Sequence, residues 1–120
     1  MEITSLTVGV PVTDLTAAVA WYRRVLELDQ PDLEPDDSVV EFDVAGTCLQ
    51  LWEAGELERA AGEQTTVRIG VTGLARERER IERLGEQPEP MVSIEGLIDF
   101  FELRDPDGNA ITLYELHEQG

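Results

Sequence analysis

Two stretches of this sequence repeat one another, and an internal duplication restricts the possible folds more than any other feature. Residues 7–15 read TVGVPVTDL and residues 66–74 read TVRIGVTGL. In both, apolar residues first alternate and then follow a helical period. Residues 46–53 and 108–115 also match, as Gly-x-x-aliphatic-polar-Leu-aromatic-Glu. Each half is therefore predicted to be a strand, a helix and then a run of antiparallel strands, which is one βαβββ module.

The module boundaries follow from the repeat. We expect one domain over residues 1–120, with a first module over 3–53, a polar linker over 54–64 and a second module over 65–117. Within these limits we predict strands over 39–44 and 98–104 and, over 29–37, a surface loop with room for one short strand. The first helix should begin after Thr13 or Asp14, and the second should end near Leu84 with Gly85 beyond it.

Composition restricts the class of protein. The 120 residues carry a net charge of −17, with 26 acidic residues against nine arginines and no lysine. A hydrophobic content of 42% supports a folded core. Because a chain this acidic repels nucleic acid and anionic membranes, we expect neither as a partner. A single cysteine, Cys48, fits a cytoplasmic location. The acidity fits salt adaptation and a solvated surface, or alternatively a cleft for a cationic ligand.

Two segments stand out as motifs: Val12-Thr13-Asp14-Leu15 with Trp21-Tyr22 in the following helix, and residues 101–109, FELRDPDGN, before the last strand. These segments resemble the vicinal oxygen chelate superfamily, which includes glyoxalase I, extradiol dioxygenases and bleomycin-resistance proteins. The similarity covers residues 3–116. It implies an α+β fold of two tandem βαβββ modules, a curved mixed sheet with a U-shaped cleft, and a homodimer.

The resemblance also implies where metal ligands would lie. The four ligand positions of the family's metal enzymes fall on Thr7, Gln50, Thr66 and Thr112. Hydroxyl and amide groups bind divalent metals weakly, so we predict no metal and no cofactor. Strand alternation turns Glu53 and Glu115 away from these positions. The only histidine, His117, is expected to be an exposed tail residue, and Cys48 lacks a histidine partner.

Alternation predicts the side chains that face the cleft. We expect a small organic molecule to bind there, against a mixture of aromatic and polar groups. The predicted ligand-binding residues are Thr7, Gln50, Trp52, Thr66, Arg68, Phe100, Glu102, Thr112 and Tyr114. Gly9, Pro11, Cys48 and Gly70 should share this face.

Arg68 and Glu102 are the two charged groups of this set, and two interpretations stay open. Arg68 could pair with Glu102 or Glu41 and hold the sheet together, because a buried charge must be compensated. Alternatively its guanidinium could grip a ligand carboxylate or phosphate. The same two residues are the weak candidates for catalysis, with Arg68 as the electrophile and Glu102 as the base.

Three functions are consistent with these residues. The first is metal-independent binding of a small molecule, as in bleomycin-resistance proteins. The second is a glyoxalase-like lyase or isomerase acting on a small carbonyl compound. The third is a degenerate, non-catalytic dimerisation module, which a cleft filled by Trp52, Phe100 and Tyr114 would favour. The alternating charges over residues 76–80 indicate a solvated helix face.

Overall fold

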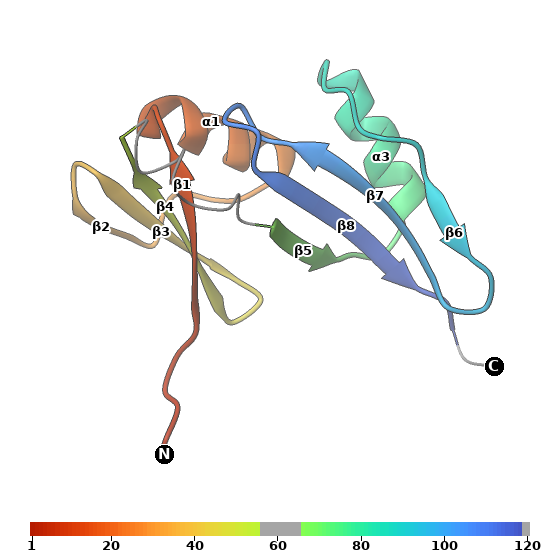
Figure 1. The fold of residues 1–120 in the computed structure, drawn as a ribbon, viewed down its shortest axis with the longest axis horizontal. Helices are drawn as coiled ribbons and strands as arrows, with labels where there is room; N and C mark the ends of the chain where they lie inside the picture. The colour runs from red at the N-terminus through yellow and green to blue at the C-terminus, as the bar shows by residue number, and fades with distance from the viewer. Residues whose placement is uncertain (56–65, 119–120) are drawn as a thin grey trace. The chain divides into compact units, whose positions relative to one another are not determined.

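The chain divides into two compact units, which are described separately (Figure 1). The computed structural model describes residues 1–55 and 66–118. Unit one comprises Met1–Thr65 and unit two comprises Thr66–Gly120. Residues 56–64 of the predicted linker lie outside the described residues.

Unit one is a single βαβββ module. Strand β1 (Thr7–Val12) is followed by helix α1 (Leu15–Val25). Strands β2 (Leu33–Asp36), β3 (Val39–Val44) and β4 (Thr47–Glu53) complete it. The sheet order is β1-β4-β3-β2, with β1 parallel to β4 and the other pairs antiparallel. The predicted strand over 39–44 is confirmed, and β2 is a short strand within the surface loop predicted over 29–37.

Unit two repeats this topology. It contains β5 (Thr66–Gly70) and helix α3 (Leu74–Arg83), followed by β6 (Val92–Ile94), β7 (Ile98–Arg104) and β8 (Ala110–Leu116). The order β5-β8-β7-β6, with β5 parallel to β8, matches that of unit one. The internal repeat therefore corresponds to a repeated fold, and the predicted α+β architecture of tandem βαβββ modules is confirmed.

In both units one face of the sheet forms the core with the helix. In unit two, α3 packs on β8 and covers one face of the sheet (Figure 1). Every second strand residue points to that face. The buried side chains of unit two include Leu74, Ile81, Phe101, Leu103, Ile111 and Leu113. In unit one they include Val10, Val12, Tyr22, Phe42, Leu49 and Leu51. The opposite face of each sheet is left for polar and aromatic side chains.

The two helices begin in different ways. Asp14 caps α1, since its carboxylate accepts a 3.0 Å hydrogen bond from the backbone N–H of Ala17. The equivalent residue before α3 is Gly73, which has a left-handed backbone and no side chain to act as a cap. The carboxylate of Glu115 on β8 fills this role and accepts hydrogen bonds from the N–H groups of Gly73 and Leu74.

The turn between β7 and β8 is held by a buried carboxylate. Asp105, only 4% exposed, accepts hydrogen bonds from the backbone N–H groups of Asp107 and Asn109 and from the side-chain amide of Asn109. Gly108 has a φ of 86°, which a residue with a Cβ rarely adopts. The motif that carried part of the family resemblance is therefore a self-contained turn.

Neither of the described helices has the length and apolar character that crossing a membrane requires.

Candidate functional site

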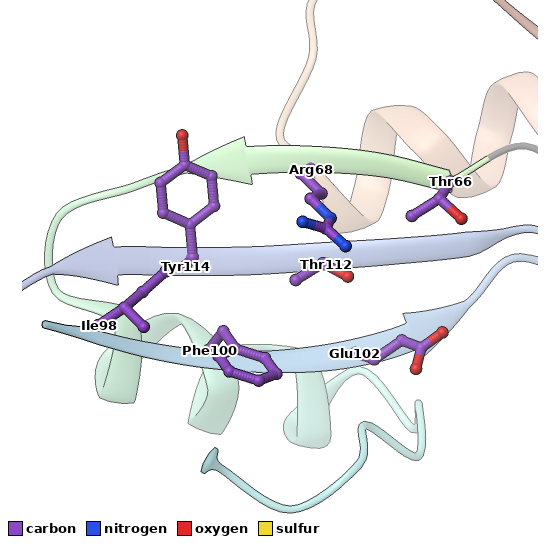
Figure 2. A pocket seen from close by; sticks show the side chains of 7 residues that line it. All are labelled: Thr66, Arg68, Ile98, Phe100, Glu102, Thr112 and Tyr114. Atoms are coloured by element: carbon purple, nitrogen blue, oxygen red, sulfur yellow. The ribbon is translucent and has the colours of Figure 1, made fainter. Parts of the chain in front are cut away.

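A cavity of about 370 Å3 opens on unit two, on the sheet face opposite α3 (Figure 2). Strands β5, β7 and β8 supply its walls. The lining residues are Thr66, Arg68, Ile98, Phe100, Glu102, Thr112 and Tyr114. Six of them are among the predicted ligand-binding residues. Ile98 was missed, although it lies two residues before Phe100 and shares its face by the same alternation.

The lining residues form two rows across the sheet. Strand register places Arg68 beside Thr112 and Thr112 beside Glu102, which makes a polar row. The next row places Gly70 beside Tyr114 and Tyr114 beside Phe100, which makes an aromatic row. Rows two residues apart along a strand are separated by about 7 Å. The pocket thus offers polar groups and aromatic rings to the same small ligand.

The charges of the polar row are not paired with each other. Glu102 forms an ion pair of 3.1 Å with Arg104. In unit one, Glu41 accepts a 3.1 Å hydrogen bond from the amide of Gln50. Arg68 is exposed, and its guanidinium forms no ion pair or hydrogen bond with any described residue of unit two. Of the two pairings considered for Arg68, the one with Glu102 is therefore not formed, and the one with Glu41 of unit one stays a prediction.

Strand order gives the physical reason. Arg68 and Glu102 are separated by the whole of β8, which is about 10 Å of sheet. Arg104 lies two residues from Glu102 on the same strand and therefore shares its face. Figure 2 shows the Arg68 side chain extending toward Thr112, while the Glu102 carboxylate points along β7 and away from Arg68.

The aromatic row depends on a glycine. A Cβ atom added to Gly70 would lie 3.0 Å from the Tyr114 ring, closer than packed carbon atoms approach. Gly70 therefore leaves the space in which the Tyr114 ring lies over β5. Gly9 of unit one is less crowded, since its added Cβ would lie 3.6 Å from Trp52 and Gln50.

Three predicted site residues lie in unit one. Gln50 and Trp52 are half-buried on β4, and Gln50 is held by its hydrogen bond to Glu41. Thr7 lines a separate cavity of about 350 Å3 together with Cys48 and the carboxylates of Asp32, Glu41 and Asp43. The role of these three residues in ligand binding stays a prediction.

His117 is not the exposed tail residue that the sequence predicted. It is half-buried, and its Nε2 lies 2.9 Å from Oδ1 of Asp99. Ser93 donates a hydrogen bond to the same carboxylate oxygen. These two hydrogen bonds, with Ser93 the larger contribution, lower the pKa of Asp99. The serine is bonded to the aspartate and not to the histidine, so the group lacks the serine–histidine contact of an activated nucleophile.

The charged run on α3 is only partly a solvated face. Arg80 pairs with Glu77, as the sequence pattern indicates. Arg78, however, is only 22% exposed and pairs with Glu82 at 2.7 Å. Its guanidinium also donates to the backbone carbonyls of Pro88 and Glu89 and lies 5.9 Å from the centre of the Phe101 ring. Arg78 therefore ties the segment before β6 to the helix.

The residues at the family's metal positions do not fit a metal ion. Thr66 and Thr112 offer neutral hydroxyls and Gln50 a neutral amide oxygen, all of which bind divalent metals weakly. Glu115 is committed to the backbone of α3 and faces away from Thr112, as alternation predicted. Within residues 1–55 and 66–118, no group of three or more His, Cys, Asp or Glu side chains is arranged to hold a metal.

Comparison with known proteins identifies the family of this chain. Residues 4–113 match the model of the Glyoxalase/Bleomycin resistance protein/Dioxygenase superfamily. This protein belongs to that superfamily. The comparison with curated proteins gives no match.

Solved structures from this superfamily and its neighbours share the fold along nearly the whole chain. The antibiotic-binding protein TnmS3 from a Streptomyces species superposes with a TM-score of 0.82 at 20% identity, over 98% of this chain and 99% of that one. A lactoylglutathione lyase from Agrobacterium tumefaciens gives 0.78 at 21% identity, over 95% and 94%. A glyoxalase/bleomycin resistance protein from Catenulispora acidiphila gives 0.76 at 24% identity, over 94% and 98%. At these identities the likeness establishes the fold alone.

Proposed function

We propose that this member of the superfamily binds a small organic molecule in the unit-two pocket and does so without a metal ion. The observation that carries the proposal is the pocket itself. Its volume of about 370 Å3 lies within the range of small-molecule sites, and its walls combine two aromatic rings with hydroxyl and charged groups.

Two further facts support binding over the other candidate functions. Phe100 and Tyr114 line the cavity and leave it open, whereas a degenerate module would be expected to fill it. For catalysis, the proposed base Glu102 is ion-paired with Arg104 and lies a full strand away from the proposed electrophile Arg68. A relative in fold, TnmS3, is described as an antibiotic-binding protein.

The test is a ligand screen with a matched pair of variants. Small aromatic compounds and antibiotics are added to the wild-type protein, and binding is measured by chemical-shift changes of backbone amides. Thr112→Phe fills the pocket floor, and Thr72→Phe places the same ring at an exposed position of unit two outside the lining. Hits should shift amides of β5, β7 and β8, bind Thr72→Phe normally and fail to bind Thr112→Phe.

Metal independence is tested with the same hits. Affinities should be unchanged after treatment with a strong chelator and after addition of Zn²⁺, Ni²⁺ or Mn²⁺. A hit that binds only in the presence of one of these ions would contradict this part of the proposal. Conversion of a hit to a new compound, followed by NMR over hours, would instead support a lyase or isomerase.

The homodimer that the resemblance implies and the cytoplasmic location that the single cysteine favours stay predictions. Sedimentation equilibrium at high and low salt would measure the mass of the particle in solution.

A further inference from the structure

We infer that the ligand of the unit-two pocket is a planar aromatic molecule that carries an anionic group. This inference rests on the proposed function and names the class of ligand for the same site. It is argued from the guanidinium of Arg68, which has no partner among the described residues of unit two, from the ion-paired carboxylate of Glu102, and from the spacing between the polar and aromatic rows.

The guanidinium of Arg68 is available to a ligand. The side chain is exposed, and no described residue of unit two forms an ion pair or hydrogen bond with its guanidinium. A guanidinium presents a planar set of donors that matches a carboxylate or sulfonate with two parallel hydrogen bonds.

Glu102 is the other charged residue of the pocket, and its carboxylate repels a bound anion only weakly. Its carboxylate is already paired with Arg104 at 3.1 Å, and Arg104 brings a second positive charge to that end of the polar row. The Glu102 carboxylate is also turned away from Arg68 (Figure 2). The local charge at the Arg68 end of the polar row is therefore positive, although the net charge of the chain is negative.

The hydroxyl groups complete an anion site. Thr112 is the cross-strand neighbour of Arg68, and Thr66 precedes Arg68 by two residues on the same face. Both hydroxyls can donate a hydrogen bond to an oxygen of an anion bound by the guanidinium. The carbonyl oxygen of a neutral amide in the same place could accept hydrogen bonds from these hydroxyls. It would lack the ion pair that an anion forms with Arg68.

The aromatic row defines the body of the ligand. Tyr114 lies beside Phe100, and Ile98 adds an apolar side chain to the same wall. Flat rings pack well on such a surface by offset or edge-to-face contact. The anion site and the ring platform are about 7 Å apart, which a fused two-ring carboxylate such as 2-naphthoate can span.

The long-range field of the chain does not favour a cationic ligand at this particular site. Charges farther than about 8 Å are largely screened at physiological salt. At contact distance a ligand therefore senses Arg68 and the Glu102–Arg104 pair more strongly than the acidic surface at large. We therefore expect the charges that line the pocket to decide between anionic and cationic ligands. A cation is disfavoured because it would approach the positive guanidinium of Arg68.

The experiment compares three probes of one shape at about 0.15 M salt: 2-naphthoate, its neutral amide 2-naphthamide, and the cation 2-naphthylmethylamine. Affinities come from calorimetry, and the site from backbone chemical shifts. We expect 2-naphthoate to bind about tenfold more tightly than the amide, as one charge-assisted interaction provides, and the amine to bind more weakly than the amide.

Variants assign the selectivity to Arg68. Arg68→Met should abolish the preference for the acid over the amide, and Arg68→Lys should retain part of this preference. Arg83→Met removes an exposed arginine of α3 outside the pocket, and it should change neither the affinity for the acid nor the affinity for the amide. If Arg68→Met does not fold, the comparison of the three probes on the wild-type protein still tests whether the pocket prefers an anion.

The outcomes separate this inference from the proposed function. If the amide or the amine binds as tightly as the acid, or if Arg68→Met retains the preference, the inference is wrong and the pocket still binds small molecules. If none of the three probes binds but the screen yields another ligand, the inference is again wrong and the function stands. If the screen yields no ligand at all, both this inference and the proposed function are wrong.

Discussion

The carboxylate of Glu115 accepts a 3.0 Å hydrogen bond from the backbone N–H of Gly73, across 42 residues of sequence. A second hydrogen bond of 3.1 Å comes from Leu74. A strand residue thereby caps the helix of its own module, in place of the local aspartate that caps α1. The negative charge also faces the positive end of the α3 dipole.

Replacing Glu115 should therefore destabilise unit two. We expect Glu115→Ala to lower the free energy of unfolding by about 1–2 kcal/mol, because two N–H groups at the start of α3 lose their acceptor. Urea unfolding measures the change. Glu53→Ala is the matched control, since Glu53 occupies the equivalent position of the repeat, is exposed, and serves a module whose helix is capped by Asp14. Equal losses for the two variants would contradict the capping role.

Gly70 and Tyr114 provide a test of packing in the pocket wall. Gly70→Ala introduces a Cβ about 3.0 Å from the Tyr114 ring, so the ring must move. We expect a loss of about 1–3 kcal/mol, typical of overpacking, together with shifted Tyr114 resonances. Gly9→Ala should be neutral or stabilising by about 0.5 kcal/mol, because its Cβ meets only ordinary contacts at 3.6 Å. An unshifted Tyr114 in Gly70→Ala would show that the ring is not held there.

Arg78 should contribute far more to stability than the other arginines of its helix face. Arg78→Met removes the hydrogen bonds to Pro88 and Glu89 and the contact with the Phe101 ring. We expect a loss of about 2 kcal/mol, since two backbone carbonyls lose a charged donor. Arg83→Met, at an exposed position, should change stability by less than about 0.5 kcal/mol. Hydrogen exchange before β6 should accelerate in Arg78→Met alone.

The Asp99 carboxylate predicts a dependence of stability on pH. Its pKa is lowered in the folded protein by the hydrogen bonds from Ser93 and His117, so the folded state favours the ionised form. The resulting stabilisation is present above about pH 4 and is lost as the pH falls through the lowered pKa. Asp99→Asn should thus unfold more easily than wild type near neutral pH, with a difference that shrinks below about pH 4.

The control for this experiment is Glu95→Gln, which removes an exposed carboxylate from the same hairpin. Its difference from wild type should be small at every pH. If Asp99→Asn differs from wild type by the same amount at pH 3 and pH 7, the hydrogen bonds to Asp99 do not depend on its ionisation.

The sequence by itself determined the repeated architecture and the face on which most pocket residues lie. Both depend on local rules. Alternation along β5, β7 and β8 separates Phe101 and Leu103 from Phe100 and Glu102 without knowledge of the partner strands. The repeat then requires that both modules share one topology. The strand over 98–104 and the cap at Asp14 were predictable for the same reason.

Only the tertiary structure decided which charges meet. The sequence shows that Arg68, Glu102 and Arg104 share a face, but the choice of partner depends on strand order, and β8 lies between Arg68 and Glu102. The contacts of Glu115 with Gly73 and of His117 with Asp99 join segments distant in sequence, so no local pattern signals them. Hydrogen bonds and ion pairs act over a few ångströms, and only the packed chain sets those distances.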